Sequence, residues 1–487
     1  MVVSMAKRIW GMPTVLVALT SSLLAQSSTG AIHDPIPAGL APAAFGLVLK
    51  EVVSFPSSEP VPPPVDQRLV RRARINYLGE IPDGTHRLYV PDLNGLLNVI
   101  QGRSPQVYVD VKTAVGASFL SGRGLGSGFG FVAFHPQFRT NGKFYTVHTE
   151  AVDTPTVKVP DLTPQPKTIV HGVVTEWTAR TPSAKVFEGE RRELLRIGFA
   201  SYVHGIQQIA FNPTARPGDA DYGLLYIAVG DGGTGVSTND PQNLAIPQGK
   251  LLRIDPQGIN SANGKYGIPP ANPFVGNTGA LGEIYAYGMR DPHRFSWDPG
   301  GTHRLFLAHI GERDIEAIYD VRAGDNLGWS EREGPFVYNK ADRCDLYPLP
   351  ADDAKYGYTY PVAAYGHNPP AGYPCDADVG HAVSGGFVYR GNAVQALRGK
   401  YLFADLVDGR LMYTEESEMR RGQPLATIHE LMVVDESGRD VTMATLVGDK
   451  RVDLRFGRDG AGELYVLSKA NGKVWKVVGT RVGGAAR

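Results

Sequence analysis

Short apolar and aromatic segments, each following a turn of Gly, Asn or His, recur along most of the chain. The pattern is seen in "HRLYVPDLNG", "NGKFYTVHTE", "GLLYIAVGDGG", "HRLFLAHIGE", "GKYLFADLVDG" and "GELYVLSKANG". These six copies are centred, 56 to 96 residues apart, on Tyr89, Tyr145, Tyr226, Phe306, Leu402 and Tyr465. A second apolar segment often follows after a polar turn, as in "GLLNVI" and "GKVWKV". Because aromatic and β-branched residues between turn residues favour strands, each copy predicts a strand–turn–strand unit.

Repeated β-units of this kind predict a stack of similar sheets, because a single unit cannot bury its apolar face alone. We predict an all-β fold, a six-bladed β-propeller of four-stranded antiparallel blades around a central channel. A pair of packed β-sandwiches is the alternative. The 58 Gly and 36 Pro residues agree with many turns. In a propeller, loops gather on one face over the channel, and we expect a functional site there.

The first residues have the charged, apolar and small-residue order of a secretory signal peptide. Their apolar stretch is interrupted by polar residues and is short for a membrane span. We therefore predict a signal peptide over residues 1–31, cleaved between Ala25 and Ala31. An uncleaved membrane anchor is the alternative. The protein is expected to be secreted or periplasmic, with no membrane span after cleavage.

The rest of the chain divides into three parts. Residues 32–67 are rich in Pro and Ala and predict a lead-in segment with little regular structure. The propeller is predicted over residues 68–480, and residues 481–487 form a tail. The only two cysteines, Cys344 and Cys375, can pair in an oxidising compartment. Two free thiols are the alternative.

The overall charge excludes one class of partner. The chain has 49 Lys and Arg residues and 49 Asp and Glu residues, so its net charge is zero. No global field attracts the protein to nucleic acid or to an anionic membrane, and we expect no nucleic-acid partner. The Gly-rich segment after Asp231 lacks the spacing of a phosphate-binding loop, so a nucleotide is not expected either.

Three local motifs carry candidate chemistry. Asp231 follows a predicted strand and opens a Gly-rich loop, where a carboxylate and exposed carbonyls suit a hard cation. An ordinary turn is the alternative. Arg290 follows another strand and is suited to bind a carboxylate or quinone oxygen, unless it pairs with Asp291. Glu312 is either a ligand or a solvated loop charge.

Several longer segments occur together in a characteristic order. They include "GFVAFHPQFRTNGKFY", "LLYIAVGDGG", "NLAIPQGKLLRID", "EIYAYGMRDPHRFSWDP", "IGERDIEAIYDVRAGDNLGW" and "SGGFVYRG". From about residue 75 to about residue 478 the chain resembles the glucose/sorbosone dehydrogenase family. Its members are exported six-bladed propellers, many of which use pyrroloquinoline quinone (PQQ) with calcium. The last two segments lean toward the branch with Hedgehog-interacting-protein-like propellers, so the fold alone does not decide the function.

The resemblance implies roles for individual residues. His204 matches the histidine that takes a proton from the sugar hydroxyl in the family's enzymes, a role that suits an imidazole near neutral pH. Arg290 matches an arginine that contacts the cofactor. Gly311 and Glu312 fall where the family offers backbone carbonyls to calcium, which polarises the quinone. Asp231 is a further candidate metal ligand.

The sequence also departs from the family pattern. Enzymes of the family usually carry His-Asn-Gly-Gly or a close variant, whereas here Gly205, Ile206 and Gln207 follow the histidine. Ser127 stands in place of a glutamine, and Asp291 in place of an asparagine. Two cofactor-binding arginines near the C-terminus align with Lys450 and Val452, with Arg451 and Arg455 nearby. Lost cationic partners weaken the binding of a cofactor with three carboxylates. The predicted cofactor-binding set is Arg290, Asp291, Lys450 and Arg451.

The resulting functional prediction is an exported quinoprotein dehydrogenase that oxidises a sugar or a sugar-derived hydroxyl or aldehyde. Its cofactors are PQQ and calcium, its substrate is a small sugar, and its electrons pass to an external acceptor. The alternatives are a non-catalytic propeller that binds a saccharide or a protein, and a calcium-dependent lactonase.

Overall fold

A computed structural model describes residues 30–32, 36, 40–154, 157–367, 381–435 and 437–482, except for the side chains of residues 342–344. The predicted signal peptide falls almost wholly outside this part. The predicted disulfide also lies outside it, because neither the side chain of Cys344 nor any of Cys375 is described. No helix of the described part is long and apolar enough to cross a membrane.

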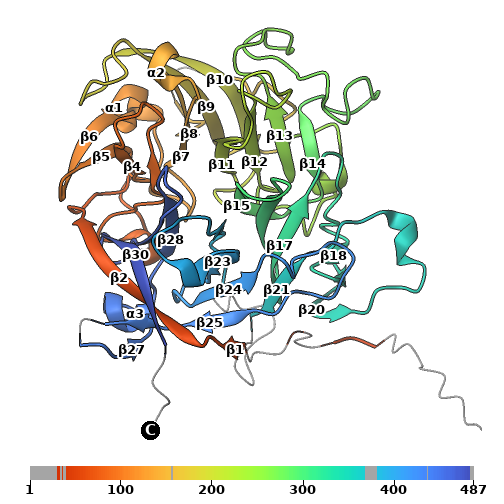
Figure 1. The fold of residues 1–487 in the computed structure, drawn as a ribbon. Coiled ribbons are helices and arrows are strands. Elements are labelled where there is room, and N and C mark those ends of the chain that lie inside the picture. Colours follow the sequence, from red (N-terminus) through yellow and green to blue (C-terminus); the bar gives the residue numbers. More distant parts are fainter. Residues whose placement is uncertain are drawn as a thin grey trace, which may run out of the picture.

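Six sheets stand side by side around a central axis in the described part of the chain, as Figure 1 shows. The first three have four antiparallel strands each and follow one another in chain order. The first consists of β3 (Gly79–Glu80), β4 (Leu88–Pro91), β5 (Leu96–Gln101) and β6 (Ser104–Asp110). The second consists of β7 (Phe129–Phe134), β8 (Lys143–Ala151), β9 (Val170–Ala179) and β10 (Gly189–Phe199). The third consists of β11 (Ile206–Phe211), β12 (Leu225–Val229), β13 (Lys250–Ile254) and β14 (Ile284–Tyr287).

The other three sheets include strands from distant parts of the chain. The fourth consists of β15 (Asp291–Trp297), β16 (Leu305–Ile310), β17 (Ile315–Val321) and β21 (Ala363–Gly366). The fifth consists of β22 (Phe387–Val388), β23 (Lys400–Ala404), β24 (Leu411–Glu415), β25 (His429–Leu431) and β1 (Ala41–Pro42). The sixth consists of β28 (Leu454–Arg458), β29 (Leu464–Ser468), β30 (Lys473–Val482), β2 (Phe45–Ser54), β26 (Val433–Val434) and β27 (Asp440–Val441).

Smaller elements connect and decorate the blades. A three-stranded sheet lies between β17 and β21 in the chain and consists of β18 (Arg332–Glu333), β19 (Phe336–Asn339) and β20 (Asp342–Tyr347). The α-helices are short: α1 (Val111–Val115), α2 (Phe138–Asn141) and α3 (Met443–Val447). The 3₁₀ turns span Gln67–Leu69, Gly116–Ser118, Asp240–Gln242, Asp353–Tyr356 and Gln395–Leu397.

The six sequence repeats coincide with the second strands of the six blades. Their central residues lie in β4, β8, β12, β16, β23 and β29, and all of them are buried. Both faces of such a strand are covered by the neighbouring blades, so these strands are apolar almost throughout. The predicted six-bladed propeller is therefore confirmed, and the alternative of two β-sandwiches is wrong.

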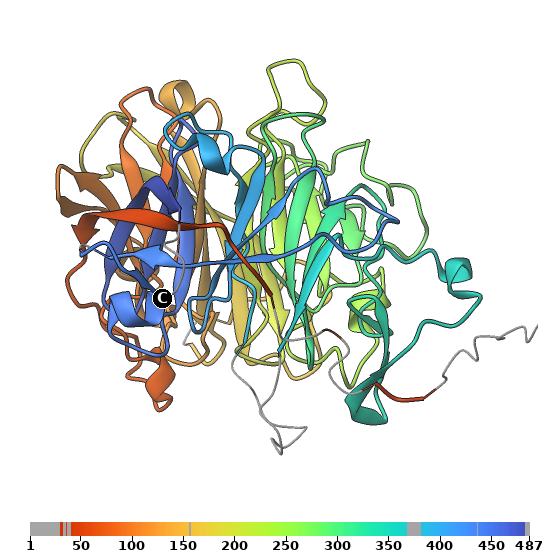
Figure 2. The ribbon, with the colours of Figure 1, turned by 60° about the horizontal axis from the view of Figure 1, so that its bottom comes forward.

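The ring is closed by a strand from the N-terminal part of the chain. β2 pairs antiparallel with β30, from Phe45 opposite Val482 to Ser54 opposite Lys473. Figure 2 shows the red β2 lying across the outer side of this blade. The prediction that residues 32–67 have little regular structure is therefore wrong for β2. This ten-residue strand was not predicted because its neighbouring residues are rich in Pro and its partner strand lies more than 400 positions away.

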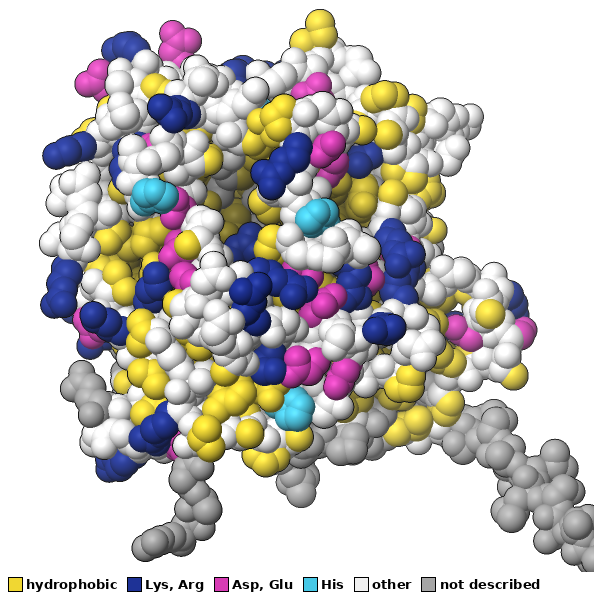
Figure 3. All heavy atoms as spheres, viewed as in Figure 1, with side chains coloured by type: hydrophobic (Ala, Val, Ile, Leu, Met, Phe, Trp, Pro, Cys, Tyr) yellow, Lys and Arg dark blue, Asp and Glu magenta, His cyan; other side chains and the backbone are white. Residues whose placement is uncertain are grey.

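Charges on the surface agree with the neutral composition. On the face drawn in Figure 3, basic and acidic side chains are interspersed rather than gathered into one patch of a single sign. This face therefore carries no extended patch of a single charge.

The role of β2 in closing the ring leads to a prediction about stability. Leu47 is fully buried in the core between the fifth and sixth blades. Leu47→Ala should lower the free energy of unfolding by about 2–5 kcal/mol, because it leaves a cavity at the closure. Lys50→Ala, on the exposed side of β2, is the matched control and should stay within about 0.5 kcal/mol of the parent chain. Urea unfolding followed by circular dichroism measures both, and equal effects of the two changes would contradict the role assigned to β2.

Candidate functional site

One mouth of the channel is hollowed into a cavity of about 390 Å³. Its wall comes from the starts of inner strands β11, β15 and β28 and from the ends of β16, β23 and β29. Eight Lys and Arg side chains but only three carboxylates line it. We call it the cationic cavity, and its basic residues are Arg68, Arg71, Arg74, Arg290, Arg313, Arg451, Arg455 and Lys469.

A histidine–aspartate pair stands at the wall of this cavity. His204 immediately precedes β11, and its Nδ1 lies 2.8 Å from Oδ1 of Asp231, which follows β12. Asp231 is almost fully buried, whereas 16% of the His204 side chain is exposed at the cavity. The backbone of His204 is left-handed, with φ of 51°. Such a conformation is uncommon for a residue with a side chain and is often found at functional sites.

Asp231 is held as an anion by a full set of donors. Besides His204, the backbone N–H of Gly233 donates to Oδ1 at 2.8 Å. The backbone N–H of Gly235 and the indole N–H of Trp329 donate to Oδ2 at 3.1 and 3.0 Å. Burial acts to raise the pKa of Asp231, but His204 and the other donors outweigh it and lower that pKa. This geometry gives Asp231 a different role from the predicted metal ligand, because its oxygens face donors and it does not line the cavity.

Arg290 lies across the cavity wall in a buried ion pair. Its Nη2 is 2.6 Å from Oε2 of Glu312, and its Nε donates to the same oxygen at 2.8 Å. Its backbone N–H donates to Nε2 of His309 at 2.7 Å. Burial alone would lower the pKa of Arg290, but Glu312 and Asp231 raise it, so the guanidinium stays charged. The Glu312 carboxylate is therefore engaged by Arg290, and a calcium ion at this position would depend on backbone carbonyls.

Gly311 and Asp291 line the cavity beside this ion pair. A Cβ on Gly311 would meet the carbonyl oxygen of Ile315 at 2.0 Å, so only glycine fits there. Asp291 begins β15 and is buried, and its Oδ1 has no hydrogen-bond partner in the described structure. Burial raises the pKa of Asp291, so its carboxyl group carries less negative charge at the position predicted to lie beside an anionic cofactor.

Three further cations in the cavity have no carboxylate bound to them in the described part of the chain. Arg74 donates to the carbonyls of Ser121 and Leu125 at 2.6 and 3.0 Å. Arg455 donates to Oδ1 of Asn76 at 3.1 Å and to its neighbour's carbonyl. Burial lowers the pKa of both arginines to about 10.

Lys469 completes this group. It is 4% exposed, and no described residue forms a hydrogen bond or an ion pair with its ammonium group. Its pKa lies well below the ordinary value because it is buried and because Arg455 and Arg74 are close. Like charges held together in a buried wall form a site for an anion. We call Arg74, Arg455 and Lys469 the cation triad.

Some of the basic residues of the cationic cavity were predicted from the sequence. Arg451 lines the cavity and pairs with Asp453, which also pairs with Arg71. Lys450 is exposed and does not line the cavity. The structure adds Arg68, Arg71, Arg74 and Lys469, which sequence reasoning missed. The basic run "RRAR" at residues 71–74 was a possible signal, but only the fold shows that it meets the C-terminal blade.

The residues that depart from the family pattern occupy different places relative to the cavity. Gln207 lines the cavity, and its backbone oxygen accepts from Nη1 of Arg294 at 2.8 Å. Ile206 is 7% exposed and turns into the core formed by the second and third blades. Its bulk therefore does not narrow the cavity. Ser127 is buried and caps its own turn through the N–H and carbonyl of Gly124.

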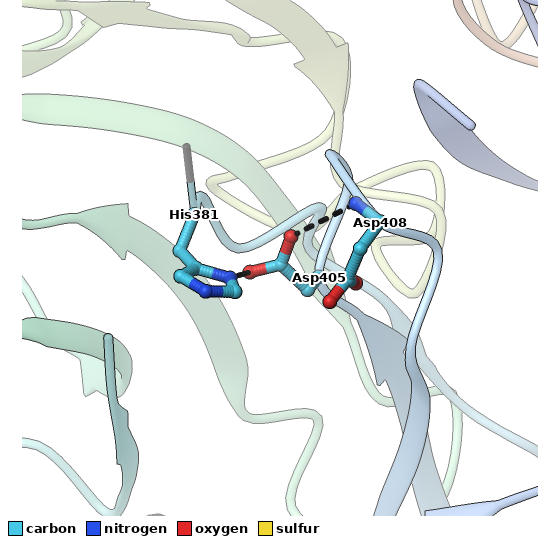
Figure 4. A group of neighbouring side chains, drawn as sticks. All are labelled: His381, Asp405 and Asp408. Atoms are coloured by element: carbon cyan, nitrogen blue, oxygen red, sulfur yellow. Dashed lines mark hydrogen bonds and ion pairs between the residues drawn. The ribbon is translucent and has the colours of Figure 1, made fainter. Parts of the chain in front are cut away.

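A group of potential metal ligands lies at the edge of the same cavity. His381, Asp405 and Asp408 place their ligand atoms within 4.8 Å of one another (Figure 4). Oδ2 of Asp405 already accepts from His381, from the backbone of Ala382 and from the hydroxyl of Tyr365, at 3.0 to 3.2 Å. Its Oδ1 accepts from backbone N–H groups of the turn that follows. Because Asp405 is satisfied by protein donors, we assign no metal to this group.

Comparison with known proteins identifies a family and several relatives of this chain. The family model described as Glucose / Sorbosone dehydrogenase matches residues 78–474. The HIPL2 protein of Arabidopsis thaliana is 31% identical over 385 residues, which are 71% of this chain and 52% of that protein. The Hedgehog-interacting protein of Mus musculus is 25% identical over 412 residues, which are 81% of this chain and 50% of that protein. The chain thus spans about half the length of these relatives.

A solved structure supports the fold. The PQQ-bound form of aldose sugar dehydrogenase from Streptomyces coelicolor matches with a TM-score of 0.54 at 19% identity, and the match covers 90% of this chain and 99% of that one. At this identity the likeness shows the fold alone. The family match, however, runs from β3 to β30 and so passes through all six blades described above. The chain therefore belongs to the glucose/sorbosone dehydrogenase family.

Proposed function

We propose that the protein is a sugar dehydrogenase that binds a PQQ-type quinone in the cationic cavity and oxidises a sugar hydroxyl or hydrated aldehyde there. The observation that carries the proposal is the placement of the His204–Asp231 pair on the wall of a cavity that also holds the cation triad. One wall is suited to accept a proton, and the other is suited to hold an anion.

The donors present fit such a cofactor. PQQ carries three carboxylates, and the triad supplies two guanidinium groups and one amino group that form no hydrogen bond or ion pair with a carboxylate among the described residues, although Asp453 lies near all three. Each charge-assisted contact of this kind is worth about 1.5–3 kcal/mol. The bound quinone would supply the acceptor for the hydride that leaves the sugar carbon. Calcium, if bound, would be held by backbone carbonyls at Gly311 and Glu312 and would act as a Lewis acid.

His204 is the proposed general base. Asp231 accepts a hydrogen bond from Nδ1, which fixes the tautomer with a free lone pair on Nε2. Nε2 takes the hydroxyl proton from the sugar as the carbon–hydrogen bond breaks. The buried Asp231 anion then stabilises the imidazolium. Arg290, kept charged by Glu312, is placed to stabilise negative charge that develops in the cavity.

The relatives favour a second candidate function, a propeller that binds a saccharide or a protein without redox chemistry. HIPL2 and Hedgehog-interacting protein match most of this chain, and the latter is named for binding a protein. This alternative predicts no cofactor binding in the cationic cavity, so a titration with PQQ distinguishes the two functions. Secretion and an external electron acceptor remain part of the proposal.

Cofactor binding depends on the triad. Arg455→Gln should weaken PQQ binding in the presence of calcium by about tenfold or more, because it removes one charge-assisted contact. Arg180→Gln, which removes an exposed cation outside the cationic cavity, is the matched control and should bind PQQ like the parent chain. Absorbance titration of the purified protein measures both. Failure of the parent chain to bind micromolar PQQ would contradict the dehydrogenase and favour the non-catalytic propeller.

Catalysis should depend on the histidine–aspartate pair. His204→Ala should lower kcat for dye reduction by about 10²- to 10⁴-fold, the range expected for a general base. Asp231→Asn should also lower kcat, since the imidazole loses the anion that sets its tautomer. His86→Ala, on an exposed turn, is the control and should leave the rate unchanged. An unchanged kcat in His204→Ala would remove His204 from the mechanism.

The buried Asp291 should make stability depend on pH. Its folded-state pKa is raised, whereas in the unfolded chain the pKa is about 3.9. The folded state therefore holds its proton longer, and its stability falls as pH rises from about 3.9 to the folded-state pKa. Asp291→Asn lacks this loss, so it should have the higher Tm at neutral pH and should converge with the parent below about pH 4. Thermal unfolding across this range measures the effect, and a difference independent of pH would contradict it.

A further inference from the structure

The opposite mouth of the channel holds a second cavity of about 440 Å³. The cationic cavity is lined by the starts of β11, β15 and β28, whereas this one is lined by the far ends of β7, β11, β15 and β28. Between the two cavities, Arg294 donates to the carbonyl of Gln207 and lies over the ring of Phe131 at 5.0 Å. The two cavities are therefore separate in position.

The walls of the second cavity are mainly aromatic and aliphatic. We call it the aromatic cavity, and its lining includes Tyr77, Phe131, Phe134, Phe211, Trp297 and Phe387. Several of these rings already contact one another, as Tyr77 and Phe131 do at 4.6 Å between centroids. A flat apolar ligand would extend this packing.

Three uncharged polar side chains of this cavity, Gln208, Ser296 and Asn212, are already bonded within the protein. The Gln208 amide bonds to both backbone groups of Phe295 at 2.8 and 2.9 Å. The Ser296 hydroxyl donates to the Gly386 carbonyl, and the Asn212 amide is bonded to Asp221. These three side chains are engaged within the protein, so they do not favour a neutral sugar as the ligand.

The Arg458 side chain differs from these groups, because one of its donors has no partner in the described structure. It lies at the end of β28 with its guanidinium over the ring of Phe387 at 5.1 Å. Its Nη1 is enclosed and has no hydrogen-bond partner in the described structure, and no described carboxylate forms an ion pair with the side chain. A cation–π contact offsets only part of the cost of removing a guanidinium from water.

The carboxylates nearest to Arg458 are engaged by other donors. Asp298 forms a bidentate pair with Arg390 at 2.6 and 2.8 Å. Asp459 pairs with Lys476 and accepts from the hydroxyl of Tyr465. Glu80 accepts from His86 and from the backbone of Gly460, each at 2.9 Å. Among the described residues, Arg458 therefore has no carboxylate paired with it, although Asp298 and Asp459 lie near enough to act on its charge.

We propose that the aromatic cavity is a second ligand-binding site, specific for a flat aromatic carboxylate whose carboxylate pairs with Arg458 and whose ring packs among the aromatic walls. The volume lies within the range of small-molecule pockets. A second cation, Arg216, is exposed at the rim and favours the entry of an anion. This site does not depend on the proposed dehydrogenase activity.

The test is a calorimetric titration of the full chain with 2-naphthoate and with 2-naphthamide, the uncharged amide of the same shape. The parent chain should bind the acid at least tenfold more tightly than the amide, because only the acid can pair with the guanidinium. Arg458→Gln should lose about tenfold or more of the affinity for the acid and keep its affinity for the amide. Arg458→Lys, which keeps the charge but not the planar fork, should fall between the two.

Arg455→Gln is the matched control, because it removes a cation from the same strand at the other cavity. It should bind 2-naphthoate like the parent chain. Equal binding of acid and amide by the parent chain, or no binding of either, would overturn the proposal without any variant. Loss of acid binding in Arg455→Gln but not in Arg458→Gln would assign the acid to the cationic cavity and would also overturn it.

Discussion

The antiparallel pairing of β2 with β30 is the constraint on which the rest of the molecule depends. It joins the N-terminal part of the chain to the last blade and closes six sheets into a ring. The segment that follows β2 is thereby placed against the start of β28, where Nε of Arg455 donates to Oδ1 of Asn76 across 379 positions of sequence. The cation triad exists only because of this closure, since Arg74 comes from one end of the ring and Arg455 and Lys469 from the other.

The cationic cavity combines two kinds of electrostatic arrangement. On one wall the charges are balanced, as in His204 with Asp231 and Arg290 with Glu312. On the other wall the arginines of the triad donate to neutral acceptors, and the nearby Asp453 is paired with Arg71 and Arg451. Holding like charges together in a buried wall is unfavourable, and the rigid blades sustain that cost. An anionic ligand would relieve it, which is the physical reason for placing a cofactor with three carboxylates there.

The inner strands give the channel two ends with different chemistry. β28 alone contributes Arg455 to the cationic cavity and Arg458 to the aromatic cavity. Both arginines lack a bound carboxylate in the described part of the chain, but their surroundings differ. Arg455 lines a cavity with other basic residues and His204, whereas Arg458 lines one with aromatic rings. A propeller can therefore carry two independent sites on one set of strands, because the two ends of each strand meet different loops.

The sequence by itself determined the repeat, the blade count and the histidine at the cavity wall. The segments around Tyr89 and its five counterparts predicted the second strands, because a strand buried on both faces is apolar throughout. That property can be read from a short stretch of sequence. Local properties did not reveal β2, whose pairing partner is distant, or Lys469, which reads as an ordinary loop lysine. They also did not show that Ile206 turns into the core or that Asp231 accepts from several protein donors. Only the tertiary structure decided these points, because ring closure sets which residues far apart in sequence share a wall and which way each side chain faces.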